Sequence, residues 1–208
     1  MGDANEGAAG APVKFGNPLP WAEPAWYDPR NASPYYGPAH VEFRAKMRAF
    51  VDGYVIPNEA AWERDGIPRE AFVKASEVGL IPTILGWPED CVSQPRPAGF
   101  DGLFLVIAFD ELCRVGNGGI VWGLVGGLGI GAPPVAHYGS DEMKQRVLRP
   151  CLDGKANIAL AVSEPTAGSD VAGLSTTAVE DGDFYVVNGT KKWIVSLARG
   201  GSWRAIDG

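Results

Sequence analysis

The segment Ala159–Asp170, with the sequence ALAVSEPTAGSD, combines the residue types in this chain that best suit a ligand. Pro165 fixes φ and lacks an N–H, while Gly168 permits positive φ, so the backbone after Val162 can turn sharply and present successive amides outward. A concave row of amides beside serine hydroxyls suits an anionic or strongly polarised ligand, such as a pyrophosphate or the polar edge of a flavin ring. The same residue types also form ordinary turns at strand ends, so both interpretations stay open on these residues alone.

Charge and the spacing of potential metal ligands exclude several classes of function. The 208 residues carry a formal net charge of -7, and without clustered Lys and Arg we expect no nucleic-acid partner. Cys91, Cys113 and Cys151 are far apart and form no C-x-x-C pair, which is typical of reduced thiols in an intracellular, soluble protein. His40 and His137 form no ligand pair with metal-binding spacing, so we expect no metal site.

The N-terminal region 1–38 differs in composition from the rest of the chain. Residues 1–12 are rich in Ala and Gly and contain no apolar core, so we expect a disordered tail and no secretory signal peptide. Phe15–Pro38 is dense in prolines and aromatic residues, which predicts an extended arm laid over a folded surface. A proline-rich ligand for a partner domain is the alternative interpretation.

Region 39–156 has the periodicity of helices. One helix is expected from His40 to Tyr54, with Pro57 kinking or ending it. Its apolar stripe consists of Phe43, Met47, Phe50, Val51 and Tyr54. The polar, solvent-facing side consists of Glu42, Arg44, Lys46 and Arg48. Further helices are expected at Pro68–Gly79, at Leu103–Arg114 and after the N-cap Ser140, where the buried stripe would be Met143, Val147 and Cys151.

The stretch Gly116–Ala136 contains no charged residue and is long enough to resemble a membrane span. Its eight glycines and the pair Pro133-Pro134 argue against a span, because each Gly costs a helix about 1 kcal/mol relative to Ala. The run Gly126–Gly131 resembles a dinucleotide-binding loop only superficially, since no strand precedes it and the glycine spacing is wrong. We therefore predict a closely packed helix in a soluble helical domain, without a membrane partner.

Beyond Ala156 the pattern changes to strands. The dipeptides Asp181-Gly182 and Asn188-Gly189 are strong signals for tight hairpin turns between consecutive strands. The fold class predicted from these patterns is α+β, with an all-α domain at 39–156 followed by a partial antiparallel β domain at 157–208. The four expected strands are Ile158–Val162, Ser175–Val179, Phe184–Val187 and Lys191–Val195.

A helical region followed by two loop and strand motifs, in this order along the chain, resembles the acyl-CoA dehydrogenase family. LAVSEPTAGSD at 160–170 and VNGTKKWI at 187–194 are specific in combination, and DELCRVG at 110–116 and GSDEMK at 139–144 support them. The resemblance covers roughly Ala39–Ile194. It implies an N-terminal helical domain, a middle β domain and a C-terminal helical bundle, with FAD held between the middle domain and the bundle.

The resemblance also implies roles for individual residues. Leu160, Ala161 and Val162 would run along the isoalloxazine, and Ser163 would offer its hydroxyl and amide to the pyrimidine edge. Such donors stabilise the charge that accumulates when hydride arrives at flavin N5. The cofactor-binding residues implied by the family are Leu160, Ala161, Val162, Ser163, Gly168, Ser169, Trp193, Ile194 and Val195, with Ser169 also assigned to the acyl-CoA substrate.

The sequence departs from the family at three points. Val195 stands where the family has a threonine, and a valine side chain cannot donate a hydrogen bond to N5. Residues 196–208 match no strand of the family. The remaining strands and the C-terminal bundle, which supplies the catalytic glutamate, have no counterpart in the chain. We therefore assign no catalytic residue, and Glu164 is expected to belong to the cofactor loop rather than to act as the base.

The function implied by the resemblance is that of an FAD-dependent oxidoreductase acting on CH–CH groups of acyl-CoA thioesters. A base removes the α-proton while a β-hydride passes to FAD, and an acceptor such as an electron-transfer flavoprotein takes the electrons. An acyl-CoA oxidase is the enzymatic rival. The alternative of another class is a truncated, non-catalytic fragment or interaction module. A homo-oligomer is expected only of a full-length protein.

Overall fold

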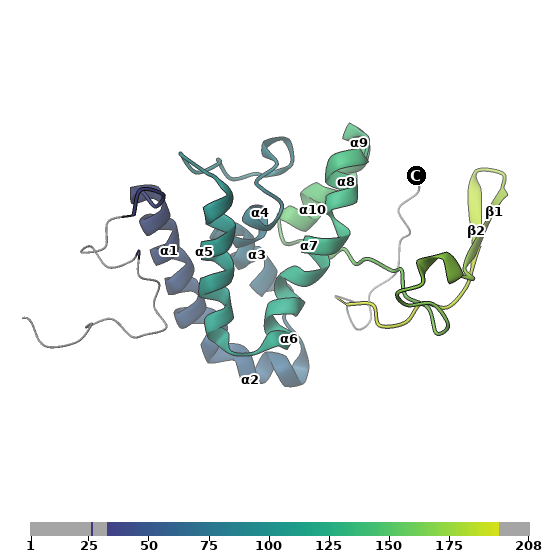
Figure 1. Cartoon of the computed structure of the whole chain (residues 1–208), viewed down its shortest axis with the longest axis horizontal. Helices are drawn as coiled ribbons and strands as arrows, with labels where there is room; N and C mark the ends of the chain where they lie inside the picture. The colour runs from purple at the N-terminus through teal and green to yellow at the C-terminus, as the bar shows by residue number, and fades with distance from the viewer. Residues whose placement is uncertain (1–25, 27–32, 196–208) are drawn as a thin grey trace, which may run out of the picture.

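The computed structural model describes residue 26 and residues 33–195, and within them a helical body leads into an extended segment and a β-hairpin (Figure 1). The expectations for the tail at 1–12, for most of the arm and for residues 196–208 lie outside the described residues. The α-helices of the described part are α1 (Pro38–Phe50), α2 (Ile56–Asp65), α3 (Arg69–Glu77), α4 (Leu80–Ile84), α5 (Gly102–Leu112), α6 (Gly118–Val121), α7 (Gly127–Gly131), α8 (Pro133–Tyr138), α9 (Asp141–Met143) and α10 (Arg149–Leu152).

Helices α1 and α2 form one helix that changes direction at a π-helical turn, Val51–Val55 (Figure 1). The predicted apolar stripe is buried, except that Tyr54 is half-buried. Pro57 lies in the first turn of α2 and does not end the helix. The wide turn before it explains this, because the Ile56 N–H donates five residues back to the Val51 carbonyl.

The predicted helix at Pro68–Gly79 is confirmed as α3, which has Pro68 at its N-cap. Gly79 follows with a left-handed φ of 88° and leads directly into α4. The predicted helix at Leu103–Arg114 is confirmed as α5, where the Asp101 carboxylate caps the start by accepting from the Leu103 N–H at 2.9 Å. Helices α1 and α5 lie side by side (Figure 1).

One of the predicted solvent-facing residues of α1 is instead buried. Arg44 has a fully buried side chain, and its Nε lies 2.8 Å from an Oε1 of Glu111 on α5. A cation enters a protein interior when a carboxylate is present to pair with it, and helical periodicity alone does not reveal such a partner. The assignment of Arg44 to the solvent side was therefore wrong.

The glycine-rich stretch is helical from Gly118 to Tyr138, through α6, a π-helical turn at Trp122–Gly126, α7 and α8. By length and apolar character it could cross a membrane. In the structure it packs against α2 and α4, and its buried residues belong to the core of the helical body. Those core residues are Ile120, Leu124, Val125, Leu128, Ala132 and Val135.

The next helical segment begins as predicted at Ser140, whose hydroxyl accepts from the Met143 N–H at 3.2 Å. It runs through α9, a π-helical turn at Lys144–Leu148 and α10. In the predicted buried stripe, Cys151 is buried and Met143 and Val147 are half-buried. The helical body therefore has one continuous apolar core, which extends from Phe43 to Ile158.

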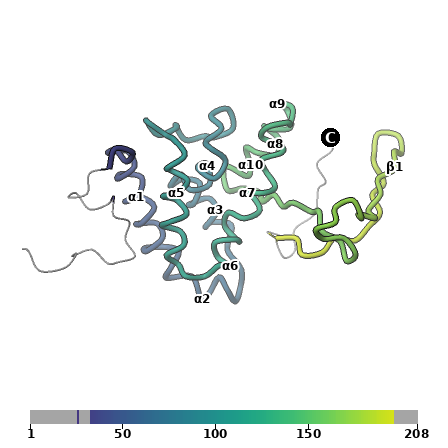
Figure 2. Tube along the Cα trace, viewed as in Figure 1, coloured from purple at the N-terminus to yellow at the C-terminus, as the bar shows by residue number. Residues whose placement is uncertain are grey.

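Two of the four predicted strands form a hairpin. Strands β1 (Thr177–Asp181) and β2 (Phe184–Asn188) pair antiparallel, with Asp181 opposite Phe184 across the turn that contains Gly182. Every residue of both strands is exposed. In the view of Figure 2, the hairpin and α1 lie at opposite ends of the described part of the structure. A mostly helical chain followed by a small antiparallel hairpin agrees with the predicted fold class.

The other two predicted strands, Ile158–Val162 and Lys191–Val195, are not formed in the described part of the chain. Their predicted assignment was wrong, and Asn188-Gly189 consequently closes no second hairpin. The reason is that an alternating apolar segment becomes a strand only when a neighbour supplies a ladder of backbone partners. The nearest backbone hydrogen bond runs from the Lys192 N–H to the carbonyl of Ser163, one residue past the first segment.

Candidate functional site

The loop at 163–170 is built on a tight turn from Glu164 to Ala167. The Glu164 N–H donates to the Ala167 carbonyl at 2.8 Å, and the Ala167 N–H donates back to the Glu164 carbonyl at 3.2 Å. Pro165 supplies the fixed φ of the turn and is exposed together with Thr166. Because Glu164 and Ala167 are both buried, the turn is anchored at its base while its tip faces outward.

The Glu164 carboxylate is the polar centre of this region, with only 4% of the residue exposed. Oε2 accepts from the Ser175 N–H at 2.6 Å and from the Ser175 hydroxyl at 2.7 Å. Oε1 accepts from the Thr176 N–H at 3.0 Å, from the Thr176 hydroxyl, and from the Lys191 ammonium at 2.9 Å. These contacts connect the loop both to the residues that precede β1 and to the segment that follows β2.

The donors around Glu164 hold the pKa of its carboxyl far below the ordinary range. The Thr176 hydroxyl makes the largest contribution, followed by the Ser175 N–H, the Lys191 ammonium and the Ser175 hydroxyl. All of them stabilise the ionised form, and burial opposes them only in part. A carboxylate so well satisfied is a poor general base.

Lys191 and Lys192 bring the second sequence motif to the loop. The Lys191 ammonium donates to the Val162 carbonyl at 3.0 Å, and the Lys192 N–H donates to the Ser163 carbonyl at 2.9 Å. Trp193 follows directly, with a positive φ of 61° and 80% of its surface exposed. The Lys192 ammonium lies 4.8 Å from the centroid of the Trp193 ring. Two motifs that are distant in sequence therefore lie side by side.

The predicted cofactor-binding residues divide between exposed and half-buried positions. Val162, Ser163 and Ile194 are half-buried and flank the contacts made by Lys191 and Lys192. Within residues 33–195, no hydrogen bond or ion pair joins Gly168 or Ser169 to the 193–195 segment. The structure thus joins 162–163 to Lys191 and Lys192, which directly precede 193–195, and leaves the tip of the loop separate. The exposed members are Leu160, Ala161, Gly168, Ser169, Trp193 and Val195.

Sequence reasoning missed the residues that join the two motifs. Lys191 was read only as the start of a strand, and Ser175 likewise. The sequence feature that could have indicated them is the glutamate in an otherwise apolar and hydroxyl-rich loop. A buried carboxylate requires hydrogen-bond donors nearby. The pattern gave no indication of which donors these are, since they come from two other segments.

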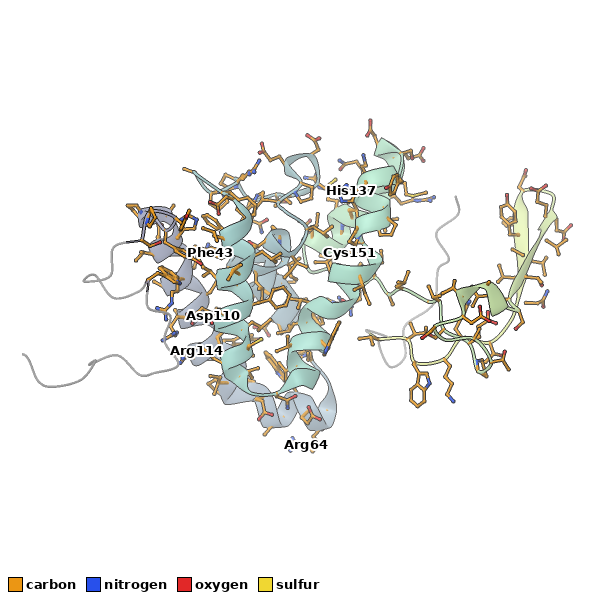
Figure 3. The ribbon with its side chains drawn as sticks, viewed as in Figure 1. Phe43, Arg64, Asp110, Arg114, His137 and Cys151 are labelled. Carbon is orange, nitrogen blue, oxygen red and sulfur yellow. The ribbon has the colours of Figure 1, made fainter. Side chains whose placement is uncertain are left out.

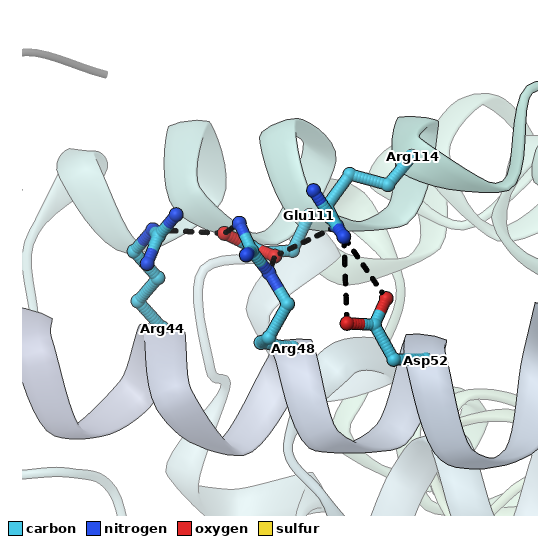
Figure 4. A network of polar contacts seen from close by, with 5 residues as sticks. All are labelled: Arg44, Arg48, Asp52, Glu111 and Arg114. Atoms are coloured by element: carbon cyan, nitrogen blue, oxygen red, sulfur yellow. Dashed lines mark hydrogen bonds and ion pairs between the residues drawn. The ribbon is translucent and has the colours of Figure 1, made fainter. Parts of the chain in front are cut away.

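A second buried carboxylate, Glu111, lies in the helical body and joins α5 to α1 (Figure 4). Besides Arg44, it contacts the guanidinium of Arg48, whose Nη2 lies 3.0 Å from Oε1. Arg114 Nε lies 3.6 Å from Oε2, and its Nη2 reaches Asp52 Oδ1 at 3.2 Å. Three guanidiniums surround a carboxylate with no exposed side-chain surface, so this cluster holds helices together and leaves no oxygen free for chemistry.

A small cavity lies in the helical body, and Cys151, which is labelled in Figure 3, forms part of its wall. Burial raises the pKa of the Cys151 thiol to about 11, so the thiol is protonated and is a weak nucleophile near neutral pH. In the described part of the chain, no group of three or more His, Cys, Asp and Glu side chains could hold a metal ion. The cavity is lined by Phe72, Ile81, Gly123, Leu124, Leu128, Cys151, Ala156, Asn157 and Ile158.

Comparison with protein families gives two adjacent matches. Residues 37–155, more than half of the chain, match the acyl-CoA dehydrogenase N-terminal domain. The chain belongs to the acyl-CoA dehydrogenase family. Residues 159–201 match the middle domain of the same family, and this second match contains both motifs of the candidate site. The match extends past Val195 to residue 201, so the expectation that the resemblance ends before residue 196 was wrong.

Individual relatives of this acyl-CoA dehydrogenase family member are much longer than the chain. It is 32% identical over 192 residues to acyl-CoA dehydrogenase AFT10-1 of Alternaria alternata, covering 88% of this chain but 44% of that protein. A crystal structure of a probable acyl-CoA dehydrogenase from Mycobacterium abscessus superposes with a TM-score of 0.68 at 37% identity, covering 77% of this chain and 41% of that one. The chain therefore spans less than half the length of these relatives.

Two further relatives of this family member carry cofactor or partner information in their names. An acyl-CoA dehydrogenase from Bacillus anthracis was solved in complex with FAD; it superposes with a TM-score of 0.63 at 25% identity, covering 76% of this chain and 27% of that one. CarC, a subunit of the caffeyl-CoA reductase–Etf complex of Acetobacterium woodii, is 34% identical over 136 residues, covering 64% of this chain and 33% of that protein.

Proposed function

We propose that this chain carries the flavin-facing loop of an FAD-dependent acyl-CoA dehydrogenase. The observation that supports this most is the meeting of two motifs, through the hydrogen bond from the Lys192 N–H to the Ser163 carbonyl and the bond from the Lys191 ammonium to the Val162 carbonyl. The two segments so joined expose large apolar side chains, at Leu160, Trp193 and Val195. An apolar surface next to backbone amides and hydroxyls fits a flavin, which has an apolar ring face and a polar edge.

FAD, when bound, supplies the hydride acceptor, and the roles of the protein residues follow from their types. Leu160, Ala161 and Val162 would pack against the ring, while the Ser163 hydroxyl and N–H would donate to its pyrimidine edge. Trp193 and its two successors cover the other side. Val195 adds apolar surface where a threonine would add a hydroxyl, so Val195 itself can offer N5 only its backbone amide.

The exposed turn at Gly168 and Ser169 is proposed to face the FAD pyrophosphate or the acyl-CoA. Gly168 has open space around its Cα, so a phosphate can approach the backbone closely there. Ser169 is proposed to contact the acyl-CoA. Among residues 33–195 we assign no base for removal of the α-proton, because Glu164 is ionised and its oxygens accept hydrogen bonds from Ser175, Thr176 and Lys191.

The α,β-dehydrogenation of acyl-CoA is accordingly proposed for the protein in which this chain acts together with the part of its relatives that it does not span. An electron-transfer flavoprotein is the proposed acceptor, in line with the name of the CarC relative. An intracellular location and a homo-oligomeric state of the full-length form belong to the same proposal.

Titration with FAD tests the proposed function directly. The purified chain is expected to bind FAD and to give the resolved visible bands of a protein-bound flavin. Acyl-CoA thioesters of several chain lengths with a ferricenium-type acceptor then test turnover, and peroxide release distinguishes an oxidase from a dehydrogenase. A colourless chain that does not change the FAD spectrum would contradict the proposal.

A second candidate function, a non-catalytic fragment or interaction module, is favoured by the exposure of both strands of the hairpin. A two-stranded hairpin is marginally stable by itself, and its unpaired edges can pair with another chain. Limited proteolysis distinguishes the candidates. A resistant core that ends near residue 156, with everything beyond it digested, supports the fragment, whereas resistance up to Val195 supports a formed flavin-facing loop.

A further inference from the structure

We propose that Glu164 and Lys191 are positioning residues, which hold the loop at 163–170 against the 193–195 segment so that the flavin-facing surface exists before the cofactor binds. This inference rests on the proposed function. It concerns residues that carry no assigned contact with FAD, since both side chains point to the protein and not outward.

The first argument is the arrangement of acceptors around Lys191. Its ammonium donates to the Val162 carbonyl at 3.0 Å and to Glu164 Oε1 at 2.9 Å. These two acceptors belong to the residues on either side of Ser163. The Ser163 carbonyl itself accepts from the Lys192 N–H. Val162, Ser163 and Glu164 are therefore held by two consecutive residues of the other motif, and the backbone of Ser163 is fixed from both sides.

The second argument is the number of donors that Glu164 gathers. Besides Lys191 it accepts from the N–H and hydroxyl of both Ser175 and Thr176. A carboxylate accepts all of these only when it is ionised, and a glutamine in its place would present an NH₂ group to donors. Lys191 would then lose the negative charge that pairs with its ammonium, in a partly buried place where an unpaired cation is unfavourable.

The third argument is a close backbone approach that allows Lys191 to reach Glu164. A Cβ added to Gly189 would lie 2.1 Å from the Thr176 hydroxyl oxygen and 2.8 Å from the Thr176 Cα. Any side chain at 189 must therefore displace Thr176 or the chain that leads to Lys191. Glycine is needed here for space, and the space is adjacent to a donor of the Glu164 cluster.

The test compares Glu164→Gln and Lys191→Met with the matched controls Glu180→Gln and Lys155→Met, whose side chains are exposed and lie outside the cluster. Three quantities are measured on the full chain: hydrogen exchange at the Lys192 amide without cofactor, the FAD dissociation constant, and the visible spectrum of bound FAD. Thermal melting followed by far-UV circular dichroism monitors the helical body, which neither substitution touches.

Both positioning variants are expected to lose protection of the Lys192 amide and to weaken FAD binding by about 10- to 100-fold, the range for loss of a charge-assisted hydrogen bond. The bound-flavin spectrum should shift toward that of free FAD, while melting of the helical body and both controls stay unchanged. Combining the two substitutions should cost little more than either alone, because both remove one interaction.

Two results would overturn the inference, and they are distinguishable. If the unmodified chain binds FAD and Glu164→Gln binds it equally well with the Lys192 amide still protected, Glu164 has no positioning role although the proposed function stands. If the unmodified chain shows no FAD binding while its Lys192 amide is protected, the proposed function fails and the positioning role for a flavin fails with it.

Discussion

The backbone N–H of Lys192 lies 2.9 Å from the carbonyl oxygen of Ser163 and donates a hydrogen bond to it. This bond joins the two motifs that the sequence places on opposite sides of the hairpin. Together with the bond from the Lys191 ammonium to the Val162 carbonyl, it connects the segments that carry the exposed Leu160 and Trp193. The candidate site therefore depends on contacts between segments, and the predictions below test those contacts and the helical body that precedes them.

Glu111→Gln is expected to destabilise the helical body by roughly 3–5 kcal/mol, because it leaves the buried guanidinium of Arg44 without its carboxylate. Asp52→Asn is the matched control, since its pair with Arg114 is largely exposed and should contribute at most about 1 kcal/mol. Urea unfolding followed by circular dichroism measures both. Equal losses for the two variants would mean that burial of Glu111 does not govern its contribution.

Gly154→Ala is expected to cost at least about 3 kcal/mol, which is at the severe end for a single substitution. Gly154 has a φ of +72°, and an added Cβ would lie 2.4 Å from the Phe72 carbonyl group. Gly66→Ala separates the two causes, because Gly66 has a φ of +94° with open space around it and should cost only about 1–2 kcal/mol. Thermal melting of both variants gives the comparison, and a Gly154→Ala variant as stable as Gly66→Ala would contradict the close contact.

The helices could be predicted from the sequence because their signals are local. The contacts that build the candidate site could not, because they join segments that are distant in sequence. The stripe from Phe43 to Tyr54 and the cap at Ser140 could be read from spacing alone, and both are present in the structure. The burial of Arg44 and the pairing of Lys191 with Glu164 depend on a partner that is distant in sequence. No periodicity contains that information.

The same physical reason accounts for the strands. Asp181-Gly182 predicted a hairpin correctly, since a tight turn and the two strands beside it form one local unit. Strands at Ile158–Val162 and Lys191–Val195 required neighbours from elsewhere, and the nearest backbone bond in the described part joins Lys192 to Ser163, one residue past the first segment. Alternating apolar residues favour a strand, but the strand forms only where a neighbouring strand supplies hydrogen-bond partners for its backbone.

Gly131→Ala tests the approach of the helical body to the start of the candidate site. A Cβ at Gly131 would lie 3.2 Å from the backbone of both Ala159 and Leu160, so these residues must shift. Gly129→Ala, two positions earlier, would make only an ordinary contact of 3.5 Å with Ile84 and should stabilise the helix by up to about 1 kcal/mol. Melting temperatures of the two variants should differ in that direction, and equal stabilisation would contradict a close approach.

The cysteines should differ in their reactivity with iodoacetamide at pH 8. Cys113 is exposed, whereas Cys91 and Cys151 are buried. Burial raises the pKa of Cys151 from 9.0 to about 11, and burial followed by the charge of Asp90 raises that of Cys91. The native thiol of Cys151 holds its proton more tightly than the unfolded one, so its contribution to stability is present below pH 9 and is lost as the pH rises toward 11.

Mass spectrometry of peptides from the labelled native chain should show modification of Cys113 first, with Cys91 and Cys151 modified only in denaturant. Raising the pH from 8 to 11 should speed labelling of Cys151 and lower the unfolding midpoint together. Rapid labelling of Cys151 at pH 8 in a chain that remains folded would contradict its burial.

The central claim is that Trp193 and residues 160–163 belong to one flavin-facing surface, and FAD titration of Trp193→Ala tests it most directly. Trp122→Ala is the matched control, because Trp122 is also exposed but lies on the helical body. The account predicts saturable FAD binding by the unmodified chain, about tenfold weaker binding by Trp193→Ala, and no change for Trp122→Ala. Equal FAD affinity in all three proteins, or no saturation up to about 1 mM FAD in the unmodified chain, would contradict it.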